Sequence, residues 1–267
     1  MTISISSFQK GKIIPYVQPI VVSDTSDVLF WEVLSRISIN GNIYPPSYFI
    51  KDLTDEQKFE LAKFLFEQVA IFQATYPNQK FSVNLSSLEI HLGISDYLIK
   101  LANINSFPRL IPNRCIIEIT ESSIIDEHTF STITFLKNSL GFLFALDDFG
   151  AERSTFKQLK NSEELFDYIK IDGSLIEDID VNEKHFLMLF HIIQIIKVLG
   201  KKSIVEFVSN ESLMNKALLA QTDFMQGYYF CEPTPIAFLN NYSLATLPSS
   251  EHIETEEEIL SYIRNVL

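Results

Sequence analysis

Acidic side chains end several short apolar runs of this sequence, and acids in such positions can bind divalent cations. Seven carboxylates lie within or at the ends of such runs: Glu32, Glu118, Glu121, Asp147, Asp148, Asp172 and Glu206. If they converge with only Lys170 as a neighbouring cation, repulsion and desolvation become severe unless cations bind. Asn84 adds an amide oxygen, and hard oxygen donors without Cys or His suit Mg²⁺, Mn²⁺ or Ca²⁺. The adjacent Asp147 and Asp148 could bridge two such ions.

Lys170 and Asp172 form a second pattern within one apolar run. They are two residues apart, so their side chains should point to the same face of a strand, while Ile169 and Ile171 point to the other. Lys170 and Asp172 can therefore share one pocket. For any one of these residues, an internal salt bridge or a solvated surface position is an equal alternative. The set as a whole favours a site.

The elements that would position these residues alternate along the chain. Apolar runs rich in Val, Ile and Phe predict strands, and apolar residues at helical spacing predict helices between them. Strands are predicted at 13–22, 28–37, 80–85, 115–120, 142–147, 167–171, 202–206 and 224–227, and helices at 55–75, 126–140, 182–199 and 210–220. This alternation predicts an α/β fold, a TIM-like (β/α)8 barrel with its chemistry at the carboxyl ends of the strands.

The two ends of the chain differ from this regular alternation. The polar stretch 23–27 is too short for a helical crossover, so the first two strands should form a hairpin that gives the barrel one antiparallel strand. No linker or repeat interrupts residues 1–245, which are predicted to form one barrel domain. In the acidic tail 246–267, Ile259, Ile263 and Val266 lie on one side of a predicted short amphipathic helix.

The composition excludes several classes of protein. Thirty-four acidic against 21 basic residues give a net charge of -13, which repels nucleic-acid backbones and anionic membranes. The sequence shows neither a signal-peptide pattern nor an apolar run long enough to span a membrane. Cys115 and Cys231 have no disulfide or metal spacing. We therefore expect a cytoplasmic protein without a membrane span, and we expect no long nucleic acid among its partners.

Eight short motifs follow one another along the chain. They read Gln18-Pro19-Ile20, Glu32-Val33-Leu34-Ser35-Arg36, Val83-Asn84-Leu85-Ser86, Glu118-Ile119-Thr120-Glu121-Ser122, Asp147-Asp148-Phe149-Gly150, Lys170-Ile171-Asp172, Val205-Glu206 and Gln226-Gly227-Tyr228-Tyr229-Phe230. Their order and spacing resemble the EAL domain family of cyclic di-GMP phosphodiesterases over about residues 10–245. The chain is similar to a divergent, stand-alone member, with Glu32-Val33-Leu34 in place of the signature Glu-Ala-Leu.

The resemblance implies a role for each matching residue. The implied metal ligands are Glu32, Asn84, Glu118, Asp147, Asp148 and Glu206. The implied catalytic residues are Lys170 and Asp172, which would hold or activate the attacking water, together with Glu206 and with Glu121, which would brace the loop after Asp148. The implied substrate contacts are Gln18, Leu34, Arg36 and Gln226.

These roles imply metal-dependent hydrolysis of cyclic di-GMP to linear 5′-pGpG, with Mg²⁺ or Mn²⁺ at a two-metal site. The resemblance also implies a homodimer, and it suggests bacterial signalling between motile and surface-attached life. Two alternatives stay open. The protein could be a non-catalytic cyclic di-GMP receptor that regulates a protein partner, or an interaction module that has lost the ligand.

Two segments depart from the family pattern. Residues 151–156 read Ala-Glu-Arg-Ser-Thr-Phe where the family usually has Thr-Gly-Tyr-Ser-Ser-Leu, and the lost glycine restricts this loop. Residues 205–209 read Val-Glu-Phe-Val-Ser where Ala-Glu-Gly-Val-Glu is usual, so Phe207 replaces a glycine. The altered loop after Asp148 motivates the receptor alternative. Every implied metal ligand is kept, however, which favours turnover.

Overall fold

The computed structural model describes residues 11–25, 27–105, 108–120, 125–151, 160 and 163–241. Ten strands in this part of the chain form one sheet in the order β10-β1-β9-β8-β7-β6-β5-β4-β2-β3, and a further pairing of β1 with β2 closes it. Eight of these strands, β1, β2 and β4 to β9, make the closed barrel. The predicted (β/α)8 architecture is confirmed.

The strands and helices have the following bounds. The strands are β1 (Lys12–Val22), β2 (Val28–Ile39), β3 (Asn42–Tyr44), β4 (Phe81–Leu85), β5 (Cys115–Thr120), β6 (Leu143–Phe149), β7 (Tyr168–Ile171), β8 (Lys202–Val205), β9 (Phe224–Met225) and β10 (Thr234–Pro235). The α-helices are α1 (Asp55–Thr75), α2 (Ser87–His91), α3 (Ile94–Asn103), α4 (Glu127–Phe135), α6 (Glu183–Val198) and α7 (Glu211–Leu219). The predicted helix 126–140 corresponds to α4 and a π-helical turn, Leu136–Leu140.

The predicted hairpin is present at the start of the barrel. The backbone N–H of Val22 donates to the carbonyl of Asp27 at 2.8 Å across the turn. Beyond it, β1 runs antiparallel to β9, whereas β2 runs parallel to β4. Two short strands, β3 and β10, also pair antiparallel, with β2 and β1 respectively. The sequence analysis missed them because two or three residues show no periodicity.

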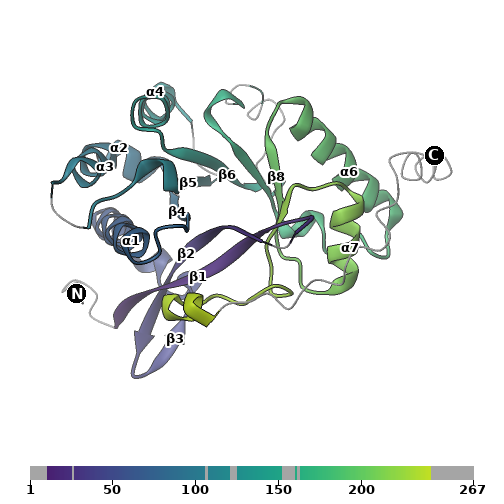
Figure 1. Cartoon of the computed structure of the whole chain (residues 1–267), viewed down its shortest axis with the longest axis horizontal. Coiled ribbons are helices and arrows are strands. Elements are labelled where there is room, and N and C mark those ends of the chain that lie inside the picture. Colours follow the sequence, from purple (N-terminus) through teal and green to yellow (C-terminus); the bar gives the residue numbers. More distant parts are fainter. Residues whose placement is uncertain are drawn as a thin grey trace. The chain divides into compact units, whose positions relative to one another are not determined.

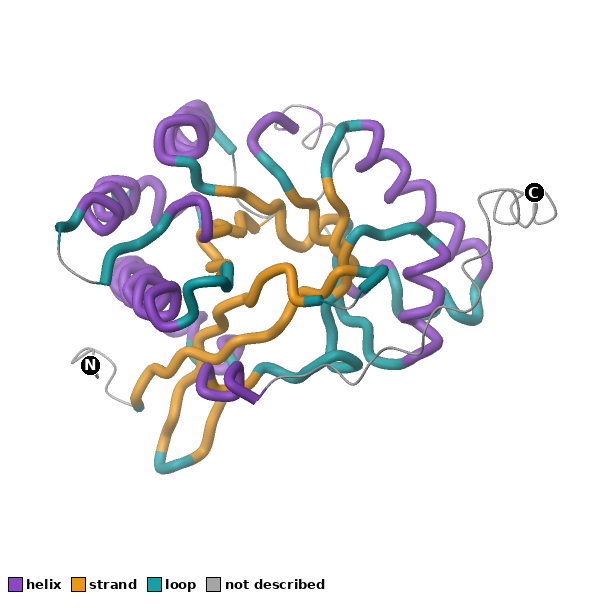
Figure 2. The backbone as a smooth tube through the Cα atoms, in the orientation of Figure 1, coloured by secondary structure: helices purple, strands orange, loops and turns teal. Residues whose placement is uncertain are grey.

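The chain divides into two compact units. The first includes Phe30–Ala145 and Pro233–Asn240, and the second includes Pro19–Leu29 and Leu146–Glu232. In the first unit, α1 to α4 lie on the outer side of β4 and β5 (Figure 1). In the second, α6 and α7 lie outside β8, as the helix and strand colours of Figure 2 make clear. None of the helices in the described ranges is long and apolar enough to cross a membrane.

Parallel strands of the barrel are buried on both faces, which explains their continuous apolar sequences. In β5 every residue from Cys115 to Ile119 is buried, and Glu118 is the one charged side chain among them. Helix starts are set by polar caps. Thr54 and Gln57 form a reciprocal capping box at α1, and Asn210 accepts from the backbone N–H of Leu213 at α7.

Asp126 caps α4 and also contacts the end of α2. Its Oδ1 accepts from the backbone N–H of Thr129 at 2.8 Å, and its Oδ2 lies 2.9 Å from Nε2 of His91. The hydrogen bond from Thr129 is the main cause that lowers the pKa of Asp126 to about 2. Hydrogen bonds to the Ser87 carbonyl and then to Asp126 raise the pKa of His91.

We expect this contact to stabilise the protein most between about pH 4 and 6.5. The Asp126 carboxylate contributes fully above its unfolded pKa, and its contribution is lost as the pH falls through about 2. The His91 contribution is present below its unfolded pKa and is lost as the pH rises through the raised folded value.

Asp126→Asn keeps a good cap for α4 but removes the charge beside His91. An NMR titration should then show a lower His91 pKa than in the wild type. The pKa should fall only in part, because the hydrogen bond to the Ser87 carbonyl remains. A His91 pKa equal to that of the wild type would contradict this.

Candidate metal-binding and active site

Asp147, Asp148 and Glu206 form an acidic cluster in the second unit. Each offers a carboxylate oxygen, and these atoms all lie within 4.8 Å of one another. Asp147 and Asp148 lie near the end of β6, and Glu206 follows β8. The backbone N–H of Glu206 donates to the Ile171 carbonyl at 3.2 Å, which continues the pairing of β7 with β8. This spacing suits a cation held between carboxylates.

Lys170 pairs with two of the three carboxylates of the acidic cluster. Its Nζ is 2.8 Å from Oδ1 of Asp147 and 2.8 Å from Oε1 of Glu206. The side chain is 1% exposed, so these ion pairs offset the cost of burying its charge. One ammonium and three carboxylates leave a formal charge of about −2. The donor set therefore fits a divalent cation both in charge and in ligand type.

Asp148 has an unusual backbone conformation. Its φ is +57°, in the left-handed region that residues with a side chain seldom adopt, and Gly150 follows with φ +101°. Consecutive residues of a regular strand point to opposite faces. The left-handed turn lets Asp147 and Asp148 both contribute an oxygen to the acidic cluster. Such outliers concentrate at functional sites, and the sequence analysis did not predict this one.

Asp172 lies beyond β7, two residues after Lys170 as predicted. Its Oδ1 accepts from the backbone N–H of Ser174 at 2.9 Å and caps the 3₁₀ turn Gly173–Leu175. Its own backbone N–H donates to the Phe149 carbonyl at 3.1 Å. Both bonds fix the position of the Asp172 carboxylate relative to β6 and β7.

Glu32, Asn84 and Glu118 form a second polar group, in the first unit. They lie on three neighbouring strands, since β4 pairs with both β2 and β5. Asn84 is opposite Glu118 in the register, and Glu32 is opposite Ser82. The Asn84 amide donates to Oε1 of Glu32 at 2.7 Å. Glu32 and Glu118 are buried, and buried carboxylates need hydrogen bonds or cations. We name this the Glu32 group.

The expected substrate contacts of the first unit extend from the Glu32 group. Leu34 and Arg36 follow Glu32 at spacings of two, so the three side chains share one face of β2. The Arg36 Nη1 donates to the Ser35 carbonyl at 2.9 Å, and its guanidinium carbon is 5.8 Å from the centroid of the Tyr16 ring. These contacts orient Arg36. Gln18, on β1, is buried.

Gln226 follows β9 in the second unit. Its backbone N–H donates to the Val205 carbonyl at 2.9 Å, and its carbonyl accepts from the Val208 N–H at 3.0 Å. At Gly227 a Cβ would lie 2.1 Å from the Val208 carbonyl oxygen, so only glycine allows this close approach. Gln226 is thus held beside Val205, the residue that precedes Glu206.

Phe207 is a site feature whose conformation the sequence analysis missed. It has φ +58°, is 66% exposed and follows Glu206. Its ring lies against Gly173, where an added Cβ would come within 2.4 Å of Cγ. A bulky aromatic residue rarely adopts a left-handed conformation, so the residue type did not predict it. The glycine that the family pattern has at this position was the one signal for a left-handed backbone there.

The structure thus assembles the predicted residues as two groups, the acidic cluster with Lys170 and the Glu32 group. Glu121, residues 152–156 of the altered loop and the tail 246–267 lie outside the described residues. Leu34 is half-buried and Gln226 is buried.

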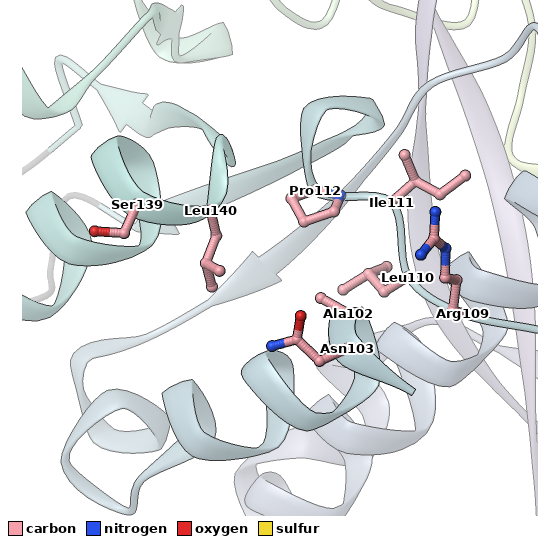
Figure 3. A pocket seen from close by; sticks show the side chains of 8 residues that line it. All are labelled: Ala102, Asn103, Arg109, Leu110, Ile111, Pro112, Ser139 and Leu140. Atoms are coloured by element: carbon pink, nitrogen blue, oxygen red, sulfur yellow. The ribbon is translucent and has the colours of Figure 1, made fainter. Parts of the chain in front are cut away.

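A separate cavity of about 210 Å³ lies in the first unit (Figure 3). It is lined by Ala102, Asn103, Arg109, Leu110, Ile111, Pro112, Ser139 and Leu140. Arg109 is the one charged residue of this lining, and no carboxylate contributes to it. The cavity therefore lacks the ligands for a metal, and the acidic cluster and the Glu32 group remain the candidates for chemistry.

Comparisons with known proteins show the family of the chain and its fold. A model of the EAL domain matches residues 4–233. The cyclic di-GMP phosphodiesterase PdeB of Shewanella oneidensis is 29% identical over 241 residues, covering 86% of this chain and 28% of PdeB. The chain thus spans less than a third of that relative.

Solved structures show the same barrel. The EAL enzyme Bd1971, in its form with cAMP and cyclic-di-GMP bound, matches with a TM-score of 0.76 at 20% identity, over 86% of this chain and 64% of that one. The calcium and cyclic-di-GMP complex of Klebsiella pneumoniae BlrP1 matches with a TM-score of 0.72 at 21% identity, over 83% and 56%.

Proposed function

This chain belongs to the EAL domain family, and from that premise we propose that it binds cyclic di-GMP and hydrolyses it to linear 5′-pGpG with divalent metal ions. The observation that carries the proposal is the acidic cluster, whose three carboxylate oxygens lie within 4.8 Å of one another and two of whose members pair with the buried Lys170. The similarity to PdeB, a cyclic di-GMP phosphodiesterase, supports the substrate and the reaction. The calcium complex of BlrP1 supports a divalent cation.

Asp147, Asp148 and Glu206 would hold a divalent cation, Mg²⁺ or Mn²⁺, and Glu32, Asn84 and Glu118 are proposed as the further ligands that a two-metal mechanism needs. Their oxygen donors are those that hard divalent cations prefer. Bound there, such ions supply a water of lowered pKa and neutralise charge on the phosphate oxygens. The Asn84 amide already orients the Glu32 carboxylate through their 2.7 Å hydrogen bond.

Lys170 and Asp172 act on the water and the phosphate. The Lys170 ammonium fixes the orientation of Asp147 and Glu206, and it places a positive charge beside the phosphorus at which negative charge develops. Asp172, anchored by its cap to Ser174, accepts a hydrogen bond from the attacking water. The water oxygen bonds to phosphorus, the bond to one ribose 3′ oxygen breaks, and the water's proton ends on that oxygen. The second ester stays intact.

Arg36, Gln18, Leu34 and Gln226 bind the dinucleotide. A guanidinium suits a phosphate because it can donate two parallel hydrogen bonds. The contact of Arg36 with Ser35 and its position by the Tyr16 ring limit the conformations that it must lose on binding. Arg36 would therefore contribute to affinity, while the acidic cluster contributes to turnover.

A turnover assay tests the proposed function. Purified protein is incubated with cyclic di-GMP and either Mg²⁺ or Mn²⁺, and the products are separated by chromatography. We expect linear 5′-pGpG with at least one metal and no product after chelation with EDTA. Binding of the dinucleotide without product under both metals would overturn hydrolysis and leave the receptor alternative. If the protein neither binds the dinucleotide nor forms product, both the hydrolase proposal and the receptor alternative are overturned.

A further inference from the structure

Phe207 has an unfavourable conformation directly after Glu206 of the acidic cluster. It is left-handed, and its side chain is 66% exposed. A left-handed phenylalanine is less favourable than a glycine with the same backbone angles, and a ring so exposed gains little from burial. Neither backbone preference nor burial therefore accounts for a phenylalanine at this position.

The backbone fixes both neighbours of Phe207. The N–H of Glu206 donates at 3.2 Å to the carbonyl of Ile171, the last residue of β7. The N–H of Val208 donates at 3.0 Å to the carbonyl of Gln226, which follows β9. The left-handed residue lies where the chain changes from one neighbouring strand to the other. The barrel backbone thus sets the direction of the Phe207 side chain.

The side chain of Phe207 contacts the backbone of Gly173. A Cβ added at Gly173 would lie 2.6 Å from Cδ2 and 2.7 Å from Cβ of Phe207. Rotation of the ring cannot remove the second contact, because Cβ is fixed to the backbone. While the two backbones keep this separation, one of the two positions must be a glycine. The family pattern has a glycine at position 207, and this chain has one at position 173.

The 3₁₀ turn Gly173–Leu175, which Asp172 caps, is held from two sides. At its start the Phe207 side chain lies against the backbone. At its end Leu175 packs on the loop after β6, where a Cβ at Gly150 would overlap Cδ1 of Leu175 and lie 3.0 Å from its Cγ. The ends of β6 and β8 also carry the acidic cluster. The turn is therefore held between the two segments that supply the carboxylates.

We propose that Phe207 is a positioning residue for the hydrolysis and acts through Gly173 on Asp172. The inference rests on the proposed function, in which Asp172 accepts a hydrogen bond from the attacking water. The Asp172 Oδ1 accepts from the Ser174 N–H at 2.9 Å, so movement of the turn moves the carboxylate. The Phe207 side chain blocks movement of the turn toward β8. Because a misplacement of about 1 Å can cost about a hundredfold in rate, this contact preserves turnover.

Phe207→Gly tests the role of the ring, because glycine keeps the left-handed backbone and removes only the side chain. With cyclic di-GMP and Mn²⁺, we expect kcat to fall about tenfold while KM changes by less than about twofold, since the ring acts on the water and not on binding. Hydrogen exchange of the Ser174 amide, followed by NMR, should become at least about fivefold faster. Phe207→Tyr keeps the ring and should change neither quantity. Phe135→Ala removes a ring of the first unit that is 46% exposed and should also change neither.

Gly173→Ala tests the contact itself. Gly173 is outside the left-handed region, so the side chain of Phe207 and not the backbone conformation opposes an alanine there. The added methyl group displaces the turn, and kcat should fall by at least about tenfold. Adding Phe207→Gly removes the clash and should return kcat at least to that of Phe207→Gly alone. Adding Phe207→Ala should restore neither kcat nor slow exchange of the Ser174 amide, because the Cβ of residue 207 remains.

The inference is overturned if Phe207→Gly leaves either kcat or the exchange of the Ser174 amide unchanged, or if Gly173→Ala is as active as the wild type. A raised KM at unchanged kcat also overturns it, because Phe207 would then bind the dinucleotide and not position Asp172. Wild-type protein that forms no product overturns the proposed function instead. Exchange of the Ser174 amide in the same variants then still decides whether Phe207 holds the turn.

Discussion

Asp147→Asn is expected to lower metal-dependent hydrolysis of cyclic di-GMP by on the order of 10³-fold, which corresponds to about 4 kcal/mol of transition-state stabilisation. Asn keeps the shape of the side chain but removes one of the three carboxylate charges of the acidic cluster. It also removes the ion pair with Lys170, whose second pair, with Glu206, remains. Initial rates of product formation at saturating Mn²⁺ measure the loss.

The loss should be specific to the site. Asp180→Asn changes a half-buried aspartate and should leave the rate unchanged within about twofold, because Asp180 contributes no oxygen to the acidic cluster. Glu32→Gln should reduce turnover as Asp147→Asn does, since it removes a buried charge from the Glu32 group while keeping an acceptor for Asn84. If Asp147→Asn and Glu32→Gln both turn over normally, the metal ligands have been assigned wrongly.

The sequence predicted the strands of the barrel well because their apolar runs are long and bounded by polar residues. The ends of β1 and β2 were predicted to within two residues. It predicted α2, α3 and β10 poorly. α2 is one short turn, and β10 is a two-residue strand containing Pro235, whose register depends on β1, more than 200 residues away in the sequence. Pairing at that separation leaves no local pattern.

The residue types of the candidate site were predictable, but its geometry was only partly so. Strand alternation predicts that Lys170 points to the other face of β7 from Ile169 and Ile171, and in the structure Lys170 pairs with Asp147 and Glu206. The same rule would separate Asp147 from Asp148. The structure joins them through a left-handed residue, a conformation that Asp adopts more readily than most residues but that strand alternation does not predict. Phe207 illustrates the same limit, since it is also left-handed and its ring lies against Gly173, which is distant from it in the sequence.

Lys170→Met is expected to lower the free energy of unfolding by about 3–5 kcal/mol in EDTA, because it leaves buried carboxylates without the ammonium that pairs with them. The lost contacts are the two 2.8 Å ion pairs to Asp147 and Glu206, and the lysine that makes them is 1% exposed. Urea denaturation measures the change. Lys51→Met, at an exposed lysine, should change stability by less than about 0.5 kcal/mol.

Mn²⁺ should restore part of this loss, and the size of the recovery tests the metal site apart from turnover. A ligand at about 100 times its dissociation constant stabilises the folded state by about 2.7 kcal/mol. In Lys170→Met the acidic cluster has lost its internal cation, so its affinity for an added cation should rise, and Mn²⁺ should stabilise the variant more than the wild type. Equal stabilisation of both proteins would mean that Mn²⁺ binds away from Lys170. In that case the ion pairs serve only to hold β6, β7 and the residue after β8 together.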